Sequence, residues 1–278
     1  MWQHVSKYTV VFLTIMFGIG FAKVIDVIVP IYYKEFFDIL AGEIEVDDVT
    51  TALIGVIIVV FLLHMVSWVL WRTSLLINAW FQTRVMADIV QTGHSYLLQH
   101  SYRFFSDSFT GSLVRKVNRL ARAFEKLADE IEFKFLGVTV IVIGNLIVLW
   151  TRSPLLGMVL LVWVILYLIL NIWFASWKTK YDYRNSQIDS EATGVLADSI
   201  TNTVTIKLFS GLKYEKDLYK EVTERQRKSR KLTWNLGEMM DAIQGLLMLV
   251  IEFVMMYIAI KLYEQGELTI GDFALIQS

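Results

Sequence analysis

The 278-residue sequence contains no cysteine, which excludes disulfide bonds, thiolate catalysis and cysteine-based metal sites. Its four histidines show no HExxH or His-x-x-His spacing, so we expect no metal site. Proline occurs only at positions 30 and 154, and such scarcity permits long uninterrupted helices, because an internal proline removes a backbone hydrogen bond and clashes with the preceding turn. Charged residues make up 19% of the chain, below the roughly one quarter of an ordinary soluble domain, and this deficit favours a membrane protein.

What the sequence has instead is long apolar runs, in a chain that is 55% hydrophobic. A membrane helix needs about 20 mostly apolar residues to cross a core of roughly 30 Å. The first run, from Tyr8 to Ala22, lacks a small-x-small cleavage site and continues into further apolar sequence, so it reads as a membrane helix and not as a signal peptide. We predict an all-α membrane protein whose membrane segments are residues 8–30, 51–71, 133–150, 155–174 and 242–262, with a sixth beginning at 273–278.

The connections between these segments alternate in length, in the order short, long, short, long, short. The two long ones are residues 72–132 and 175–241. Of the 26 Lys and Arg residues, 21 lie in 72–134 and 178–231, whereas the first short loop has one, Lys34, against six acidic residues. The positive-inside rule therefore predicts that both long connections are cytoplasmic.

Both long connections keep a helical pattern and contain no proline. In the first, apolar residues recur at alternating spacings of four and three on one side of a helix: Leu113, Val117, Leu120, Phe124, Leu127 and Ile131. About twenty residues of such a helix would extend roughly 30 Å from the bilayer. We therefore expect the membrane helices to continue into the cytoplasm and to pack there as a bundle.

Each long connection must reverse direction at its far end, and the turns fall near residues 101–111 and 198–211. Both stretches are rich in small hydroxyl residues, which favour caps and turns over helix interiors. Both also carry apolar residues where exposure to water is expected, namely Phe104, Phe105, Ile200, Val204 and Ile206. Apolar groups at an exposed tip indicate a surface for a partner protein.

Four stretches resemble the transmembrane domain of ABC exporters of the type IV, six-helix kind. Tyr102–Leu113 is similar to the first intracellular loop of that family, where a Phe-Phe pair precedes a glycine and then a leucine, and Val195–Phe209 is similar to the second. Gln265–Asp272, with its Gly-Glu-Leu-Thr-Ile-Gly sequence, matches the external turn between helices five and six, and Val29–Asp38 matches the outer end of helix one. In this order, on the alternating layout, the resemblance covers nearly the whole chain.

The sequence departs from the family in lacking a nucleotide-binding domain. Family members continue from helix six into that domain, whereas no Gly-x-x-x-x-Gly-Lys-[Ser/Thr] phosphate loop occurs here. We therefore expect no catalytic activity and no bound cofactor from this chain alone, with ATP and Mg²⁺ held by the missing domain. The chain is then either a fragment of a longer reading frame or a truncated gene product.

The resemblance also implies where the chain meets its partners. The two tips would be coupling helices that contact the ATPase domains, through Tyr102, Arg103, Phe104, Phe105 and Asp107 in the first tip and Ile200, Thr201, Asn202 and Thr203 in the second. Helices four and five would cross to a second half-transporter, in a homodimer or a heterodimer, so that the second tip touches the opposite ATPase. For Phe104 and Phe105 the alternative is packing within the bundle.

Four polar residues at membrane depth are candidates for the wall of a translocation cavity, namely Lys23, Asp26, Asn145 and Glu252. Charges at that depth are costly and tend to face a cavity or a partner. Lys23 and Asp26, three residues apart on one helix face, could instead pair near the outer interface. A neighbouring helix could equally satisfy Glu252, and Asn145 could be an interhelical hydrogen-bonding group.

We therefore expect an exporter subunit that forms the translocation path and partners the lipid bilayer, a nucleotide-binding domain and a second half-transporter, but no nucleic acid. The expected location is the bacterial inner (plasma) membrane, which the chain would cross several times. The competing hypothesis is a non-transporting membrane scaffold or regulatory subunit, whose sequence would look the same over this range. Lipid, drug and peptide exporters share the layout, so the sequence does not name the cargo.

Overall fold

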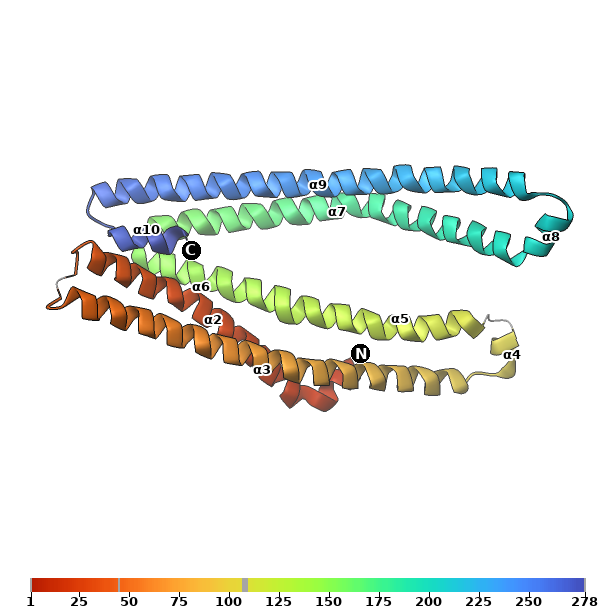
Figure 1. The fold of residues 1–278 in the computed structure, drawn as a ribbon, viewed down its shortest axis with the longest axis horizontal. Coiled ribbons are helices and arrows are strands. Elements are labelled where there is room, and N and C mark those ends of the chain that lie inside the picture. Colours follow the sequence, from red (N-terminus) through yellow and green to blue (C-terminus); the bar gives the residue numbers. More distant parts are fainter. Residues whose placement is uncertain (1, 45, 107–109, 278) are drawn as a thin grey trace. The chain divides into compact units, whose positions relative to one another are not determined.

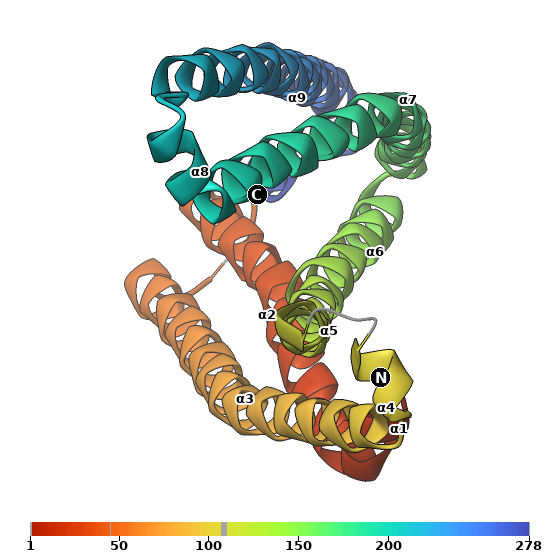
Figure 2. The same cartoon turned by 90° about the vertical axis from the view of Figure 1, so that its right-hand side faces the viewer.

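The computed structural model describes residues 2–44, 46–106 and 110–277, and every regular element among them is helical, which confirms the all-α prediction (Figures 1 and 2). Most of the chain lies in a few very long helices, and the shorter elements mark its turns. In chain order the elements are α1 (Trp2–Val5), the 3₁₀ turn η1 (Ser6–Tyr8), α2 (Thr9–Leu40), α3 (Val49–Leu98), α4 (Tyr102–Ser106), α5 (Thr110–Asp129), the π-helical turn η2 (Glu130–Phe135), α6 (Leu136–Arg152), α7 (Pro154–Thr201), α8 (Thr203–Leu208), α9 (Leu212–Glu264) and α10 (Ile270–Gln277).

Five helical stretches are long and apolar enough to cross a membrane, namely Trp2–Leu40, Val49–Leu98, Leu113–Arg152, Pro154–Thr201 and Leu212–Glu264. At 1.5 Å per residue, the helices of 48 to 53 residues measure roughly 70–80 Å, more than twice the thickness of a bilayer core. They therefore extend well beyond their apolar segments, as the sequence predicts. Pro30 does not end the first long helix, because α2 continues through it to Leu40.

The chain folds into two compact units, which are residues 1–157 together with 258–278, and residues 158–257. In the first unit α2 packs along α3, α6 and α10, and α3 packs along α5. The face of α2 that is buried repeats at spacings of four and three, as helical packing requires: Ile15, Ile19, Ala22, Ile25 and Val29. On α3 the buried apolar residues opposite this face include Val56, Val60, Phe81 and Val85.

The face that α5 turns toward α3 differs from the predicted apolar seam. Leu113, Ala121, Phe124 and Ala128 are buried, and the Phe124 ring lies 6.5 Å from the Phe81 ring of α3, centroid to centroid. Three members of the predicted seam are exposed instead, and for them the prediction was wrong: Leu120, Leu127 and Ile131. The physical reason is side-chain size, since alanines let two helices approach closely whereas leucines would hold them apart.

The second unit is an antiparallel pair formed by α7 and α9, which α8 joins at one end (Figure 1). In its apolar part, Trp163 Nε1 donates to the carbonyl oxygen of Leu247 at 3.3 Å, and the side-chain amide of Gln244 donates to that of Asn171. In its charged part the cross-contacts are those of Asp189 with Gln226 and Arg230, Glu191 with Arg225, and Ser199 with Glu215. Polar cross-contacts therefore join α7 and α9 in both the apolar and the charged part of the unit.

Candidate functional site

The first tip is built on aromatic contacts that lead from α3 into α4. Ring centroids of Tyr96 and His100 lie 4.8 Å apart, those of His100 and Phe104 4.3 Å, and those of Phe104 and Phe105 5.4 Å. Phe104 and Phe105 are half-buried in this stack, whereas Tyr102 is 88% exposed. The stack therefore orients α4, and the contact of Tyr102 with a partner stays a prediction.

This arrangement is compatible with both hypotheses for Phe104 and Phe105, which are contact with an ATPase domain and packing within the bundle. One part of each ring packs within the tip, and another part stays accessible. The sequence-based selection did not include His100, although its position between two aromatic residues was the available signal. Asp107 lies outside the described residues, and so does the side chain of Arg103.

The second tip owes its shape to side-chain hydrogen bonds onto the backbone of α7. Thr203 Oγ1 donates to the carbonyl oxygens of Ser199 at 3.0 Å and Ile200 at 2.7 Å. Asn202 Nδ2 donates to the carbonyl oxygen of Asp198 at 3.0 Å. Such local bonds compete with the regular helix ladder and favour a turn, so Asn202 and Thr203 are shaping residues.

An exposed apolar ridge follows this turn. It consists of Ile200, Val204, Leu208 and Phe209, all more than half exposed. Ile200 was predicted as a contact residue, whereas Leu208 and Phe209 were not, although both are apolar and lie within the predicted turn at residues 198–211. Thr201, also predicted, is exposed beside the ridge.

Lys23 and Asp26 form an ion pair on α2, with Lys23 Nζ 2.9 Å from Asp26 Oδ2 and 5.4 Å from the centre of the Trp71 ring. The pair lines a pocket of about 380 Å³ between α2 and α3, together with Ala22, His64, Ser67, Trp68 and Trp71. Seventeen residues separate Lys23 from the Leu40 end of α2, which is about 26 Å of helix. The predicted membrane segment, however, ends at residue 30, only seven residues or about 10 Å from Lys23, so both the cavity role and the pair near the outer interface stay predictions.

The other two cavity candidates lie on different helices. Asn145 is half-buried on α6, and Glu252 is exposed on α9 in the second unit. The cavity role of Asn145 and Glu252 therefore stays a prediction.

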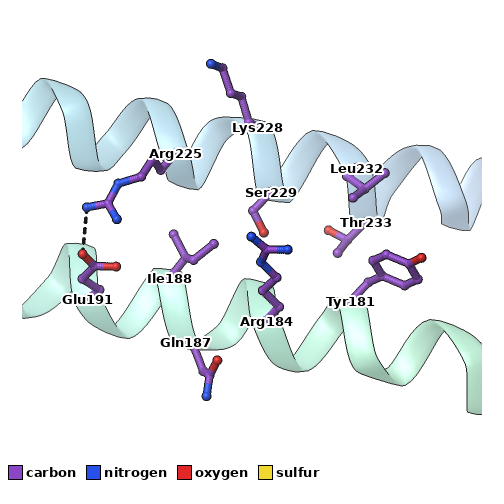
Figure 3. Close-up of a pocket in the computed structure, with 10 residues that line it drawn as sticks. All are labelled: Tyr181, Arg184, Gln187, Ile188, Glu191, Arg225, Lys228, Ser229, Leu232 and Thr233. Carbon is purple, nitrogen blue, oxygen red and sulfur yellow. Dashed lines mark hydrogen bonds and ion pairs between the residues drawn. The ribbon is translucent and has the colours of Figure 1, made fainter.

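A pocket of about 530 Å³ lies between α7 and α9 in the charged part of the second unit (Figure 3). Arg184, Arg225 and Lys228 line it, against a single carboxylate, Glu191, which pairs with Arg225 at 2.8 Å. Apolar surface comes from Tyr181, Ile188 and Leu232. The excess of basic groups favours an anionic ligand over a cationic one.

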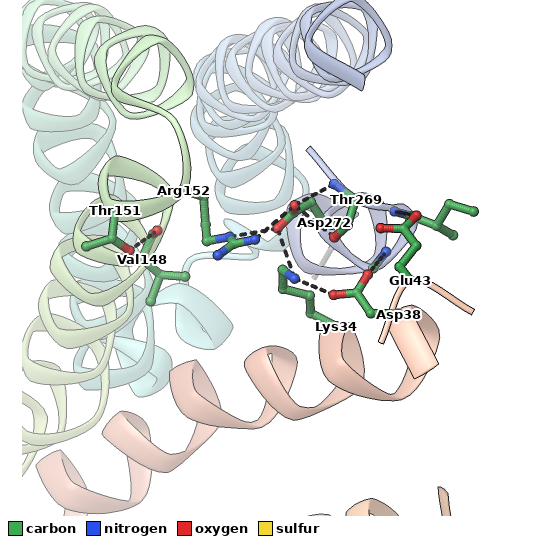
Figure 4. Close-up of polar contacts among 10 residues, drawn as sticks. Lys34, Asp38, Glu43, Val148, Thr151, Arg152, Thr269 and Asp272 are labelled. Carbon is green, nitrogen blue, oxygen red and sulfur yellow. Dashed lines mark hydrogen bonds and ion pairs between the residues drawn. The ribbon is translucent and has the colours of Figure 1, made fainter. Parts of the chain in front are cut away.

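A buried network of charges, which the sequence-based selection missed, ties α6 and α2 to the start of α10 (Figure 4). Arg152 binds Asp272 through two bonds, Nε to Oδ1 at 2.8 Å and Nη2 to Oδ2 at 3.1 Å. Lys34 Nζ pairs with Asp38 and lies 3.8 Å from Asp272 Oδ1. Asp38 and Asp272 are 2% and 1% exposed, so two basic groups neutralise two carboxylates that are out of contact with water.

The carboxylates of Asp272 and Asp38, together with that of Glu43, accept hydrogen bonds from backbone N–H groups at the start of α10. Thr269 donates to Asp272 through its N–H at 2.9 Å and its hydroxyl at 3.0 Å. The N–H of Ile270 donates to Glu43 at 3.0 Å, and the N–H of Gly271 donates to Asp38 at 2.8 Å. These groups would otherwise lack partners at a helix start, so the network also caps α10.

Five helical stretches that are long and apolar enough to cross a membrane define a polytopic membrane domain. A family model described as the ABC transporter transmembrane region matches residues 11–278, so the chain belongs to this family. It is 26% identical over 263 residues to the mitochondrial iron–sulfur clusters transporter ATM1 of Candida albicans, covering 92% of this chain and 34% of the relative. It is also 26% identical to the ATM1 protein of Saccharomyces cerevisiae, over 92% and 37% of the two chains.

A vertebrate protein is similar as well. ATP-binding cassette sub-family B member 6 of Xenopus tropicalis is 27% identical over 210 residues, which are 70% of this chain and 24% of that protein. The chain thus spans about a third of the length of the ATM1 relatives it matches. Those relatives are named as mitochondrial, so the expectation of a bacterial inner membrane gains no support, while an integral multi-pass protein is shown.

Proposed function

We propose that this chain forms the translocation path of an ATP-driven exporter and receives the energy of ATP hydrolysis through α4 and α8. The observation that carries the proposal is the exposed apolar ridge at the second tip, formed by Ile200, Val204, Leu208 and Phe209. About 26 residues, or roughly 40 Å of helix, separate this tip from the apolar segment that ends near residue 174, so lipid does not cover the ridge. Burying such groups against a nucleotide-binding domain is favourable by about 25 cal/mol per Å².

A second half-transporter is the other partner that the exposed surface supports. Three exposed residues, Leu120 and Leu127 on α5 and Ile131 on η2, form an apolar stripe that precedes the apolar segment beginning at residue 133. An apolar stripe facing water favours association with another protein surface. Either a homodimer or a heterodimer would cover it.

An anionic cargo is favoured by the pocket between α7 and α9. Three basic groups against one carboxylate attract anions, and a volume of about 530 Å³ lies within the range of small-molecule sites. The ATM1 relatives are named for iron–sulfur clusters, which thiolates usually hold. Because this sequence has no cysteine, we propose that a cargo of that kind would arrive with its own ligands.

The test uses the assembled exporter, with its ATP-hydrolysing domains, in proteoliposomes. The double variant Val204→Ser, Leu208→Ser should still insert into the membrane. It should uncouple ATP hydrolysis from transport, because the apolar contact with the nucleotide-binding domain is lost. The matched control is Lys207→Ala, which changes an exposed charged residue of the same short helix outside the apolar ridge, and this variant should transport normally. Normal coupling in the double variant would exclude α8 as the coupling surface, and absence of any transport by the unaltered assembly would favour a scaffold.

A further inference from the structure

Glu132 is a carboxyl group with no exposure to water, although it lies among charged residues of the sequence. It sits on η2, the π-helical turn between α5 and α6, and faces α3. Asn78 and Gln82, one turn apart on α3, are within hydrogen-bonding reach of it. Burial raises the pKa of Glu132, and this is the larger effect, whereas bonds donated by the side-chain amides of Gln82 and Asn78 lower that pKa. A π turn inside a long α-helix is uncommon and often accompanies a functional site.

The hydrogen bonds around Glu132 leave two buried oxygen atoms unsatisfied. Gln82 Nε2 donates to Asp129 Oδ1 at 2.9 Å and reaches Glu132 Oε2 only at 3.4 Å. Glu132 Oε1 and Asn78 Oδ1 are both buried without a hydrogen-bond partner among the described residues. Buried polar atoms are nearly always satisfied, so this pair of acceptors calls for a donor.

Nearby basic residues do not supply that donor. Lys134, two residues along the chain, turns to the exposed side and pairs with Glu130 at 2.7 Å. On α2, Lys23 pairs with Asp26 at 2.9 Å. Among the described residues, the charged group that acts on Glu132 is Asp129, whose negative charge adds to the cost of a second carboxylate.

A metal ion is also a poor candidate. Oxygen-binding cations take six or more ligands, whereas the residues that the structure describes contain no group of three or more His, Cys, Asp or Glu side chains suited to a metal. The amide nitrogen of Gln82 points its donor hydrogens toward the carboxyl, which repels a cation. A single proton needs no such ligand shell.

We propose that Glu132 binds a proton and that the resulting carboxylic acid donates a hydrogen bond to Asn78, so that one proton satisfies both unpaired oxygens. Removal of a carboxyl from water disfavours its ionised form, which fits the burial of this group. The bond joins α3 to the junction of α5 and α6. Loss of the proton would place a charge within the packed interface that includes Trp71 and Phe133, whose rings lie 5.8 Å apart, and would loosen it.

The sign of the pH effect follows from proton binding. The folded state holds the proton at a pH where the unfolded state has released it. The free energy of unfolding therefore falls as the pH rises through the titration of Glu132 in the folded state. The interface would thus be tight at low pH and looser at high pH. This coupling of a proton to helix packing goes beyond the proposed transport function and does not depend on it.

Infrared difference spectroscopy of the purified protein in lipid nanodiscs tests the proposal. At neutral pH we expect the C=O stretch of a protonated carboxyl in the unaltered protein and in the control Glu130→Gln, an exposed neighbour on the same turn. Glu132→Gln should abolish this band. The melting temperature of this variant should also lack the part of the pH dependence that Glu132 contributes in the unaltered protein. An ionised carboxylate signal at every pH above the ordinary pKa of a glutamate would overturn the proposal. It would favour a water molecule that bridges Glu132 and Asn78.

Asn78→Leu provides a second variant in case Glu132→Gln fails to fold. Its protonated-carboxyl band should move to higher frequency, because the acceptor of the hydrogen bond is gone. An unshifted band would show that the proton, if present, does not join Glu132 to Asn78. The titration of the unaltered protein needs no variant and decides whether the proton is bound.

Discussion

Asp272 serves three helices with a single carboxylate. It binds Arg152 at the end of α6, lies beside Lys34 of α2 and caps the start of α10 through Thr269. A buried ion pair adds little stability relative to an apolar replacement, but removing one partner strands the other charge. Arg152 is 38% exposed, so water would take up part of that cost.

A double-mutant cycle should measure this coupling. With Arg152→Ala, Asp272→Ala and the double variant, we expect a coupling energy of about 1–3 kcal/mol in the free energy of unfolding. The matched control is the exposed pair of Glu130 and Lys134, for which a cycle should give at most about 0.5 kcal/mol. Denaturant unfolding in mixed micelles is the measurement, and equal coupling in the two cycles would contradict a buried network.

Gly271 is required where α10 meets α2. A Cβ at this position would overlap the carbonyl oxygen of Lys34 and the carboxylate of Asp38. Gly271→Ala should therefore destabilise the protein by about 3 kcal/mol, at the upper end of overpacking costs. Gly55→Ala, in α3 with open space around it, is the control and should be neutral or stabilising by up to about 1 kcal/mol. The two melting temperatures decide, and similar values would be evidence against the close approach.

At the scale of elements, the sequence predicts the helices well and their contact faces less well. Apolar runs and the scarcity of proline suffice to place the first five predicted segments within long helices, while the sixth, 273–278, lies only in part within the described residues. The α5 seam was predicted from hydrophobicity alone, which ranks Leu120 and Leu127 above Ala121 and Ala128. The choice between them depends on how closely α3 approaches, and that distance is a property of two helices together. The sequence also did not predict the roles of Glu132 and Asp272, because their partners lie far away in the sequence and depend on how the helices pack.

Two substitutions distinguish the observed face of α5 from the predicted one. Ala121→Leu should overpack the contact with α3 and lower the free energy of unfolding by about 1–3 kcal/mol. Leu120→Ala, on the exposed side, should change it by no more than about 0.5 kcal/mol. Thermal unfolding of the isolated chain provides the comparison. The reverse order would restore the seam predicted from sequence.

At the scale of the whole molecule, the boundary between the two units falls inside α7 and α9 and not in a loop. Two continuous helices therefore lead from one unit into the other. A helix transmits displacement along its axis better than a flexible linker does. This construction supports the proposed role of the tips within the second unit, because α7 and α9 are unbroken over their parts of residues 158–257 and would carry a displacement of α8 along that unit.

The absence of cysteine makes the topology directly testable, since any introduced thiol is the only one in the chain. Gln265→Cys, in the exposed turn between α9 and α10, should react with a membrane-impermeant reagent in intact cells or vesicles of native orientation. Asn202→Cys, at the second tip, should react only after the membrane is breached, because the basic connections are expected on the inner side. External labelling of position 202 would reverse the orientation and end the coupling proposal.

The π-helical turn has a geometric effect on the rod that α5, η2 and α6 form. The N–H of Leu136 bonds to the carbonyl oxygen of Ile131, five residues back, so the turn holds more residues than an α turn would. Each residue of an α-helix advances its side chain by about 100° around the axis. The extra residue in the turn changes which side of the helix faces the neighbouring helices. Before the turn, α5 presents alanines to α3, and after it α6 presents Gly137 and Gly144 to α2. Deleting one residue here would rotate the glycines out of register and break that contact without altering a single side chain in it.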